Sequence, residues 1–448
     1  MYTDPKILES IKRVEAHREE NAKLDPRRMT AEEKEVLLRT CHPDYRENQF
    51  TELRIGPNKG GKVPLELAAL LEGRSRLGEQ LPSLTEPDYD ADVLIIGGGA
   101  SGMAAALSAA QDAGNQVTLL ERQARVGRKL LATGNGRCNL TNRNLGAENY
   151  HGQTARFVLP ALARYGVEQT LAAFETLGLV TVTEPSGRVY PFSDQANSVV
   201  DVLRFALEAA GVTIVCGCEV CEVKKKARGY QARAVTGETY FGDRLIVAAG
   251  GCAGRKLGGT EAGYALLEAL GHERTPLFPS LVQIRTETDF VRALKGVRAD
   301  GRIALKENGH VTRTSEGELQ FTEFGVSGPA AFELSRAVST GGGERTLLID
   351  FCRALDEEAL WALLTARRAR FPGLAAEELL TGLLQSRLGK TLVRRAGLNA
   401  AKPLAELTDA ELRAVCGLIR CCPIAVTGVM GMDNAQVTAG GVRTAQFR

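Results

Sequence analysis

The chain has 448 residues, of which 44% are apolar and 25% are charged, and its formal net charge is +2. This length predicts two or three domains with large cores, and the balanced charge argues against a nucleic-acid or anionic membrane partner. Ten cysteines in so long a chain do not indicate a disulfide scaffold, and the charged residues 1–20 are unlike a signal peptide. We therefore expect a cytoplasmic protein.

Residues 1–90 are expected to form a helical N-terminal extension. Apolar residues at helical spacing over 7–14 predict a first helix. Thr30 and Glu33 have the pattern of a capping box ahead of a second helix, and Leu65–Leu71 are predicted to form a third. The turn-rich residues that follow are interpreted as a linker into the main body.

The most informative stretch, residues 91–121, predicts a dinucleotide-binding unit. A short apolar strand over 93–96 runs into a G-x-G-x-x-G turn, and a helix that starts near Ala100 follows, rich in small helix formers over 104–113. A second strand over 117–120 comes next, and Glu121 closes the unit. The three glycines of the turn are Gly97, Gly99 and Gly102. A Gly-rich turn in a ligand-free sheet is the alternative, but the complete order of elements favours nucleotide binding.

The chemistry of this unit follows from its backbone. Glycines allow the main chain to approach a pyrophosphate without an intervening Cβ, and the N-terminus of the helix directs free N–H groups at the phosphates. Glu121 is placed to accept hydrogen bonds from the ribose hydroxyls of an adenosine, and its charge disfavours a 2′-phosphate.

A basic, Gly-rich segment after Glu121 favours FAD over a nicotinamide as the cofactor of this domain. The cations are Arg122, Arg125, Arg128, Lys129 and Arg137, and the glycines are Gly127, Gly134 and Gly136. Such a loop suits a long cofactor that lies across the top of the sheet, whereas the alternative is a solvated basic loop.

The rest of the chain divides into two kinds of segment. Up to residue 275 we expect a hairpin, with one arm over 212–224 and the other over 230–235, and a buried strand over 244–248 that ends in Ala-Gly-Gly. Charged β-like residues 301–324 and then a helical region over 356–416 follow, and they are interpreted as an inserted cap.

The sequence indicates few candidates for catalytic side chains. Cys216, Cys218 and Cys221 suggest either a metal or redox site or a strand with small thiols, and we favour the strand and expect no metal. The catalytic residues are unknown at this stage. Tyr190 and Tyr264 are candidates to face a substrate, although core packing is the default role of a tyrosine.

Several strings along the chain resemble the BaiN-type flavoproteins, also known as the aminoacetone oxidase family. They include GRKLLATGNGRCNLTN, GRVYPFSDQANSV, FGVSGPA and VTAGGV, and the resemblance runs from about residue 91 to the C-terminus. It implies an α/β fold: a three-layer ββα, Rossmann-like FAD/NAD(P)-binding domain with inserted β-rich and helical cap domains. We accordingly expect the FAD domain over 91–275, the cap over 276–425 and the start of a return to the FAD domain over 426–448.

The resemblance also implies which residues contact FAD. They are Gly97, Gly99, Ala100, Ser101 and Gly102 at the pyrophosphate; Glu121, Arg122 and Val220 at the adenosine; Gly127, Lys129, Gly134, Gly136, Arg137, Cys138 and Asn139 along the ribityl chain and ring; and the turn Ala249, Gly250 and Gly251. For Cys138 a packing thiol is the alternative, and for Arg137 a structural ion pair. The chain departs from the family at Ala248 and Ala249, which lack a threonine, and at Glu261 and Ala262, which replace Gly-Asp.

We therefore predict an FAD-dependent oxidoreductase, reductase or oxidase, that acts on a small organic substrate with NAD(P)H as electron donor. No nucleic acid or membrane partner is expected. The family carries a further C-terminal segment, whereas this chain stops at Arg448. The alternatives are consequently a non-catalytic flavin- or nucleotide-binding protein, or a site completed by another chain or within a homo-oligomer. A flavin-using RNA-modifying enzyme is a third interpretation, which the near-neutral charge disfavours.

Overall fold

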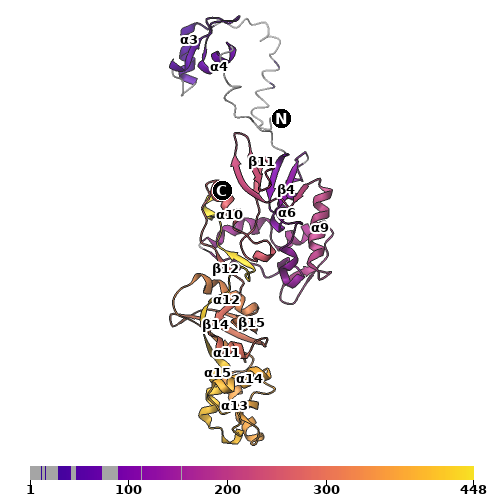
Figure 1. The fold of residues 1–448 in the computed structure, drawn as a ribbon, viewed down its shortest axis with the longest axis vertical. Helices are drawn as coiled ribbons and strands as arrows, with labels where there is room; N and C mark the ends of the chain where they lie inside the picture. The colour runs from indigo at the N-terminus through magenta and orange to yellow at the C-terminus, as the bar shows by residue number, and fades with distance from the viewer. Residues whose placement is uncertain are drawn as a thin grey trace. The chain divides into compact units, whose positions relative to one another are not determined.

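The structure is a computed structural model that describes residues 12, 16, 29–41, 47–72, 89–112, 114–152 and 154–447. It consists of two units, Met1–Glu86 and Pro87–Arg448 (Figure 1). None of the helices in the described ranges is long and apolar enough to cross a bilayer.

The first unit contains both helices and strands. Its elements are α3 (Ala31–Cys41), β1 (Phe50–Glu52), β2 (Lys62–Pro64) and α4 (Leu65–Leu71). The predicted capping box is confirmed, because Thr30 N donates to Glu33 Oε2 at 2.9 Å and Glu33 N donates to Thr30 Oγ1 at 3.2 Å. The helix at α4 is also confirmed. The antiparallel pair β1–β2 was not expected of a helical extension, and the helix predicted over 7–14 falls outside the described residues.

The second unit is built on a six-stranded sheet. Its strand order is β8 (Thr213–Cys216), β4 (Val117–Glu121), β3 (Tyr89–Ile96), β11 (Thr239–Val247), β10 (Tyr230–Ala234) and β9 (Val220–Lys225). The first four strands are parallel, whereas β11, β10 and β9 are joined as antiparallel neighbours. The predicted strand–helix–strand unit over 91–121 is thus confirmed, and its helix, α6 (Ala100–Ala109), begins where it was expected.

The two faces of β3 enter different cores, which makes this part of the molecule three layers deep. Val93 and Ile95 pack in a core that includes Met103 of α6 and Leu203 of α9 (Ala196–Ala209). The alternate residues, such as Leu94, pack in a second core with residues of β9, β10 and α10 (Ala262–Ala269). A strand buried on both faces is continuously apolar, and the predicted three-layer α/β class is confirmed.

The prediction that residues 212–224 form one arm of a hairpin is wrong. The segment over 212–224 is divided between β8, which pairs with β4 in the sheet, and β9, which pairs with β10. Gly217 separates the two strands with a φ of +74°, a conformation that glycine adopts readily. The β9–β10 hairpin itself is confirmed.

Smaller elements connect the sheet to the rest of this unit. They are the 3-10 segment η2 (Leu130–Gly136), a small sheet of β5 (Thr141–Asn142), β7 (Arg188–Pro191) and β6 (Thr181–Thr183), and the helices α7 (Leu159–Arg164) and α8 (Val167–Thr176).

The inserted region is nested. Strand β12 (Phe278–Ser280) pairs with β19 (Val437–Ala439), and the chain between them forms a closed barrel. The barrel strands in spatial order are β13 (Ile284–Thr286), β16 (Gly325–Ser327), β15 (His310–Phe321), β14 (Arg298–Glu307), β17 (Arg345–Asp350) and β18 (Cys422–Val429). Helix α11 (Thr288–Ala293) follows β13, and α12 (Pro329–Thr340) packs against several barrel strands and β12.

A helical insertion interrupts the barrel between β17 and β18. Its helices are α13 (Glu357–Arg370), α14 (Ser386–Arg395) and α15 (Asp409–Arg420) (Figure 1). The predicted β-rich segment followed by a helical one is therefore confirmed, while the residue limits of the domains remain predictions.

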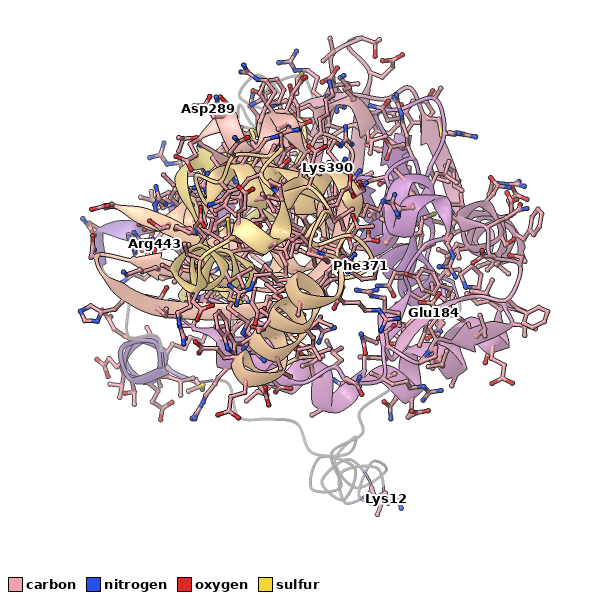
Figure 2. The ribbon with its side chains drawn as sticks, turned by 90° about the horizontal axis from the view of Figure 1, so that it is seen from below. Lys12, Glu184, Asp289, Phe371, Lys390 and Arg443 are labelled. Carbon is pink, nitrogen blue, oxygen red and sulfur yellow. The ribbon has the colours of Figure 1, made fainter. Side chains whose placement is uncertain are left out.

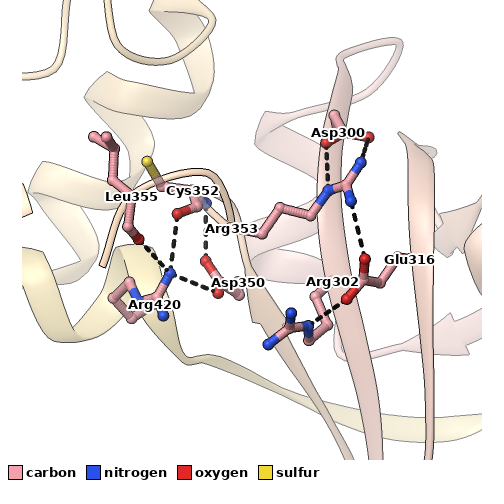
Figure 3. A network of polar contacts seen from close by, with 8 residues as sticks. All are labelled: Asp300, Arg302, Glu316, Asp350, Cys352, Arg353, Leu355 and Arg420. Carbon is pink, nitrogen blue, oxygen red and sulfur yellow. Dashed lines mark hydrogen bonds and ion pairs between the residues drawn. The ribbon is translucent and has the colours of Figure 1, made fainter. Parts of the chain in front are cut away.

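Ion pairs hold this helical insertion together and join it to the barrel. Lys390 of α14, labelled in Figure 2, lies 2.6 Å from Glu378 and 3.4 Å from Glu377. Arg420 of α15 contacts the buried carboxylate of Asp350, at the end of β17, at 2.9 Å (Figure 3). Removing one partner of such a pair would leave the other charge without its main interaction.

Candidate functional site

A cavity of about 540 Å³ lies at the carboxyl ends of the parallel strands. Its walls come from the β3–α6 turn, the end of β4, the basic loop before η2, the start of β9, the turn after β11, the start of α10, and β19. Ligands of open α/β sheets bind at this edge, so the segments that the sequence singled out separately meet around one hollow.

The glycines of the first turn serve different physical purposes. A Cβ on Gly97 would lie 2.5 Å from the carbonyl oxygen of Ala248, and a Cβ on Gly102 would lie 1.8 Å from the carbonyl oxygen of Gly97. These two glycines therefore allow the strand, the helix and the β11 turn to pack closely. Gly99 is different: its Cβ position has nothing within 4 Å, and the residue lines the cavity.

The N-terminus of α6 opens onto the cavity beside Gly99. Gly99 is the N-cap and makes no side-chain capping hydrogen bond, and Ala100 and Ser101 of the first turn also line the cavity. The first N–H groups of a helix lack intrahelical partners and carry the positive end of the helix dipole. A cradle of bare backbone at such an end fits a pyrophosphate.

Glu121 lies at the end of β4 with both carboxylate oxygens fixed by backbone. Gly98 N donates to Oε2 at 2.6 Å, and Gln123 N donates to Oε1 at 2.7 Å. Each carboxylate oxygen accepts more than one hydrogen bond, so the group is oriented and still has acceptor sites for ribose hydroxyls. Beside it, the Arg122 guanidinium donates to the Gly258 carbonyl oxygen at 2.9 Å.

The wall of the cavity also carries Lys129. Its ammonium donates to the carbonyl oxygen of Ala253 at 2.8 Å and to that of Gly251 at 3.4 Å. Within the described part of the chain, no carboxylate lies close enough to form an ion pair with it. Burial lowers the pKa of Lys129, and the nearby Cys252 partly opposes this effect. A half-buried cation held by carbonyl groups favours a negatively charged occupant.

The turn after β11 is fixed by Thr438 of β19. Thr438 Oγ1 accepts a hydrogen bond from Ala253 N at 2.9 Å, and a Cβ on Gly251 would lie 2.5 Å from that same hydroxyl oxygen. The contact brings β19, on the far side of the insertion in sequence, against the nucleotide domain. Thr438 and its neighbour Gln436 consequently line the cavity.

The two tyrosines proposed to face a substrate have different environments. Tyr264 of α10 lines the cavity, its hydroxyl would lie 3.3 Å from a Cβ on Gly251, and burial raises its pKa. Tyr190 of β7 is buried and lies beneath the Arg137 guanidinium, 3.9 Å from the ring centroid. Tyr264 therefore stays a candidate, whereas Tyr190 is part of the packing.

Most of the residues that the resemblance implied for FAD meet at the cavity. Those in its wall are Gly97, Gly99, Ala100, Ser101, Glu121, Arg122, Lys129, Val220, Ala249, Gly250 and Gly251. Those outside its wall are Gly102, Gly127, Gly134, Gly136, Arg137, Cys138 and Asn139. The second group, apart from Gly102, belongs to the loop around η2.

That loop is held by structural contacts. Arg137 forms ion pairs with Asp194 and with Glu184, the latter at 2.9 Å; Glu184 is labelled in Figure 2. Cys138 is buried, and burial raises the pKa of its thiol. These contacts match the alternatives of a structural ion pair and a packing thiol, and any contact of this loop with FAD stays a prediction.

Sequence reasoning missed Gln436, Thr438 and Arg128 as wall residues. Arg128 is part of the basic loop. Thr438 lies inside the VTAGGV string, where a polar residue close to paired glycines could have indicated a cavity wall. Of the three clustered cysteines, Cys218 is buried and borders the cavity, whereas Cys216 and Cys221 are exposed. Among the described residues, no group of three or more His, Cys, Asp or Glu is arranged to hold a metal.

Comparison with known proteins adds to this geometry. The sequence model of the family described as HI0933-like protein Rossmann domain matches residues 91–448. A Clostridium scindens protein named 3-dehydro-bile acid delta(4,6)-reductase is 37% identical over 359 residues, which are 79% of this chain and 87% of the relative. A ribosomal RNA dihydrouridine synthase of Escherichia coli is 30% identical over 356 residues, 79% of this chain and 86% of the relative.

Solved structures also resemble the chain. A 3-ketosteroid-delta4-(5alpha)-dehydrogenase from Rhodococcus jostii RHA1 matches with 18% identity and a TM-score of 0.41, over 80% of this chain and 86% of the other. The open form of a flavocytochrome c3 fumarate reductase matches with 16% identity and a TM-score of 0.35, over 80% of this chain and 68% of the other.

Proposed function

The chain belongs to the HI0933-like family of FAD-dependent oxidoreductases, and we propose that it reduces a carbon–carbon double bond conjugated to a carbonyl group in a small organic acid. Membership confirms the predicted resemblance and the prediction of an oxidoreductase. The observation that carries the proposal is the cavity, whose wall joins the Gly97–Gly99 cradle, Glu121 and Lys129 in one continuous hollow.

The cavity fits FAD in its order of chemical groups. Glu121 would hold the adenosine ribose, the cradle around Gly99 the pyrophosphate, and Lys129 the end of the cofactor that carries the ring. FAD, when bound, supplies a ring that accepts and donates a hydride. The protein's own part is to orient that ring, exclude water and place proton donors.

The proposed substrate class comes from the relatives. The name of the Clostridium scindens protein describes reduction of a 3-dehydro-bile acid, a carboxylic acid with a carbonyl group, at unsaturated positions. Dihydrouridine, the product named for the Escherichia coli relative, is also formed by saturating a double bond conjugated to a carbonyl. The two names share this chemistry, and we extend it to this chain.

Such a reduction needs a hydride at the β-carbon and a proton at the α-carbon of the substrate. We assign the proton to the hydroxyl of Tyr264, because it borders the cavity and a tyrosine hydroxyl is protonated at neutral pH. NADH or NADPH is proposed as the electron donor, and the cytoplasm as the compartment. We further propose that the substrate is a small molecule and that the protein has no nucleic-acid or membrane partner. The comparisons hold nothing in favour of a non-catalytic protein.

The test is spectroscopic and uses the purified full-length chain. We expect a flavin absorption spectrum after FAD is added, bleaching by NADH or NADPH under argon, and recovery of the spectrum on adding 3-oxochola-4,6-dienoic acid with formation of a saturated product. Replacing Tyr264 by Phe should slow the recovery and leave the bleaching intact. If no conjugated enone reoxidises the bleached protein, the proposed reaction is overturned.

A second candidate function is reduction of uridine in ribosomal RNA. It is favoured by two relatives named ribosomal RNA dihydrouridine synthase, at 30% and 28% identity. The same bleached protein, offered unmodified ribosomal RNA, separates the two functions: dihydrouridine in the RNA without enone turnover would favour the second candidate over the first.

A further inference from the structure

The turn after β11 that holds Lys129 is itself held by residues that follow the inserted barrel. Ala253 N donates to Thr438 Oγ1 at 2.9 Å, and Gly254 N donates to the carbonyl oxygen of Met432 at 2.8 Å. Both partners come after β18, the last barrel strand in chain order, and Thr438 is 185 residues from Ala253 in sequence. The place of the Lys129 ammonium therefore depends on a distant part of the chain.

The contact between the turn and the returning chain is closely packed. Cys252 is buried, and its Sγ lies 3.6 Å from Met432 Sδ and 3.7 Å from Thr438 Oγ1. Gly251 makes room for the same hydroxyl, because a Cβ there would lie 2.5 Å from Thr438 Oγ1. In such a close-packed contact, a shift of the Thr438 side chain requires a shift of the turn.

Two backbone hydrogen bonds determine where the Ala253 carbonyl group points. This carbonyl accepts from Lys129 Nζ at 2.8 Å, and it shares a planar peptide unit with the Gly254 N–H. The bond from Gly254 N to Met432 therefore sets the tilt of that peptide unit. The bond from Ala253 N to Thr438 fixes the residue from its other side. Only Thr438 accepts through a side chain, so its contribution can be removed by substitution.

Lys129 retains one donor for a ligand. An ammonium group has three N–H donors, and two of them are directed at the carbonyl oxygens of Ala253 and Gly251. The third makes no hydrogen bond to any residue that the structure describes, and the side chain lines the cavity. Because carbonyl groups carry no net charge, the positive charge of Lys129 remains available to an anionic cofactor.

We propose that Thr438 is a positioning residue, which fixes the turn whose carbonyl groups hold the Lys129 ammonium against FAD. This inference rests on the proposed function and adds a role in cofactor binding for the strand that returns from the insertion. Thr438 itself also lines the cavity, so a direct contact with the cofactor is the alternative that the test has to separate from positioning.

A double-mutant cycle separates the two roles. FAD affinity is measured calorimetrically for the full-length wild type, Lys129→Met, Thr438→Val and the double variant. We expect Thr438→Val to weaken FAD binding by about three- to tenfold, because valine has the shape of threonine but cannot accept the Ala253 N–H. The double variant should bind FAD within about twofold of Lys129→Met alone. Losses that multiply in the double variant would overturn the positioning role.

Conservative and control variants distinguish the hydrogen bond from packing. Thr438→Ser keeps the hydroxyl and should bind FAD within about twofold of wild type. Thr438→Ala removes the same acceptor without adding a methyl group, and it repeats the cycle with different packing. Thr444→Val removes another hydroxyl of the returning chain, which contacts Thr154 Oγ1 at 2.6 Å outside the cavity wall, and should leave FAD affinity unchanged. A loss in Thr438→Ser or Thr444→Val as large as in Thr438→Val would refute the assignment.

The outcomes also separate this inference from the proposed function. Absence of FAD binding in the wild type would refute both. FAD affinity that responds to Lys129→Met but not to Thr438→Val or Thr438→Ala would refute only the positioning role. FAD affinity that responds to none of these changes would place both side chains away from the cofactor and refute the inference, whereas the proposed function would stand.

Discussion

Replacing Gly99 by alanine should separate cofactor binding from folding. Gly99 has φ −79° and ψ −173°, which alanine also adopts, and its Cβ would meet no atom of the protein within 4 Å. Alanine at an N-cap stabilises a helix less than glycine does. In the other direction, removing glycine's conformational freedom from the unfolded chain stabilises the fold by about 0.4–1 kcal/mol. These effects nearly cancel, and the unfolding free energy of the apo-protein should stay within about 0.5 kcal/mol of wild type.

The new methyl group would instead occupy the space that we assign to the pyrophosphate. Loss of one charge-assisted hydrogen bond, at about 1.5–3 kcal/mol, predicts FAD affinity lower by about 10- to 150-fold. Calorimetric titration with FAD and urea unfolding of the apo-protein measure the two quantities. Gly417→Ala on α15, which also meets nothing within 4 Å, is the matched control and should leave FAD affinity unchanged. Wild-type FAD affinity in Gly99→Ala would show that the phosphates lie elsewhere.

Three further changes test other parts of the structure. Glu121→Gln retains one acceptor oxygen for the two backbone donors at Gly98 and Gln123. It should lower FAD affinity by about tenfold and also lower the melting temperature of the apo-protein. An unchanged FAD titration would exclude a ribose contact. Lys129→Met removes the half-buried cation of the cavity and should weaken FAD by about tenfold, whereas unchanged FAD affinity would place the ammonium away from the cofactor. Hydrogen bonds from Lys402 and the backbone of Thr408 lower the pKa of Glu411 to about 2; because the folded-state pKa lies below the unfolded one, Glu411 stabilises the fold at neutral pH and this contribution disappears as the pH falls from about 4.5 toward 2. The melting temperatures of wild type and Glu411→Gln should accordingly differ at pH 7 and converge below pH 2, and a constant difference would contradict the shift.

The nucleotide-binding half could be predicted from the sequence because its signals are local. Strands β3 and β4, the turn at Gly97 and the acid at Glu121 follow one another within about thirty residues, the length of a βαβ unit, and each has a residue type that its backbone position demands. The division of 212–224 into β8 and β9 was missed, because both halves are short and only their partner strands distinguish them. Pairing between distant segments has no such local signature.

The part of the cavity wall that β19 supplies could not be predicted for the same reason. Thr438 reaches Ala253 only because β19 pairs with β12 after the chain has completed the barrel and its helical insertion. The closed barrel likewise depends on β13 meeting both β16 and β18. Patterns of strand and helix indicated the content of the insertion, but not that its two ends return together to the nucleotide domain.

This nesting separates the nucleotide domain from the inserted barrel. No side chain fits at Gly97 or Gly102, since a Cβ at either position would collide with backbone, so this part of the nucleotide domain is sterically fixed. The β12–β19 stem connects it to a barrel with its own core. The residues of that core are distinct from those that pack on the two faces of β3. Substitutions in the barrel can therefore change that part of the molecule without repacking the nucleotide domain.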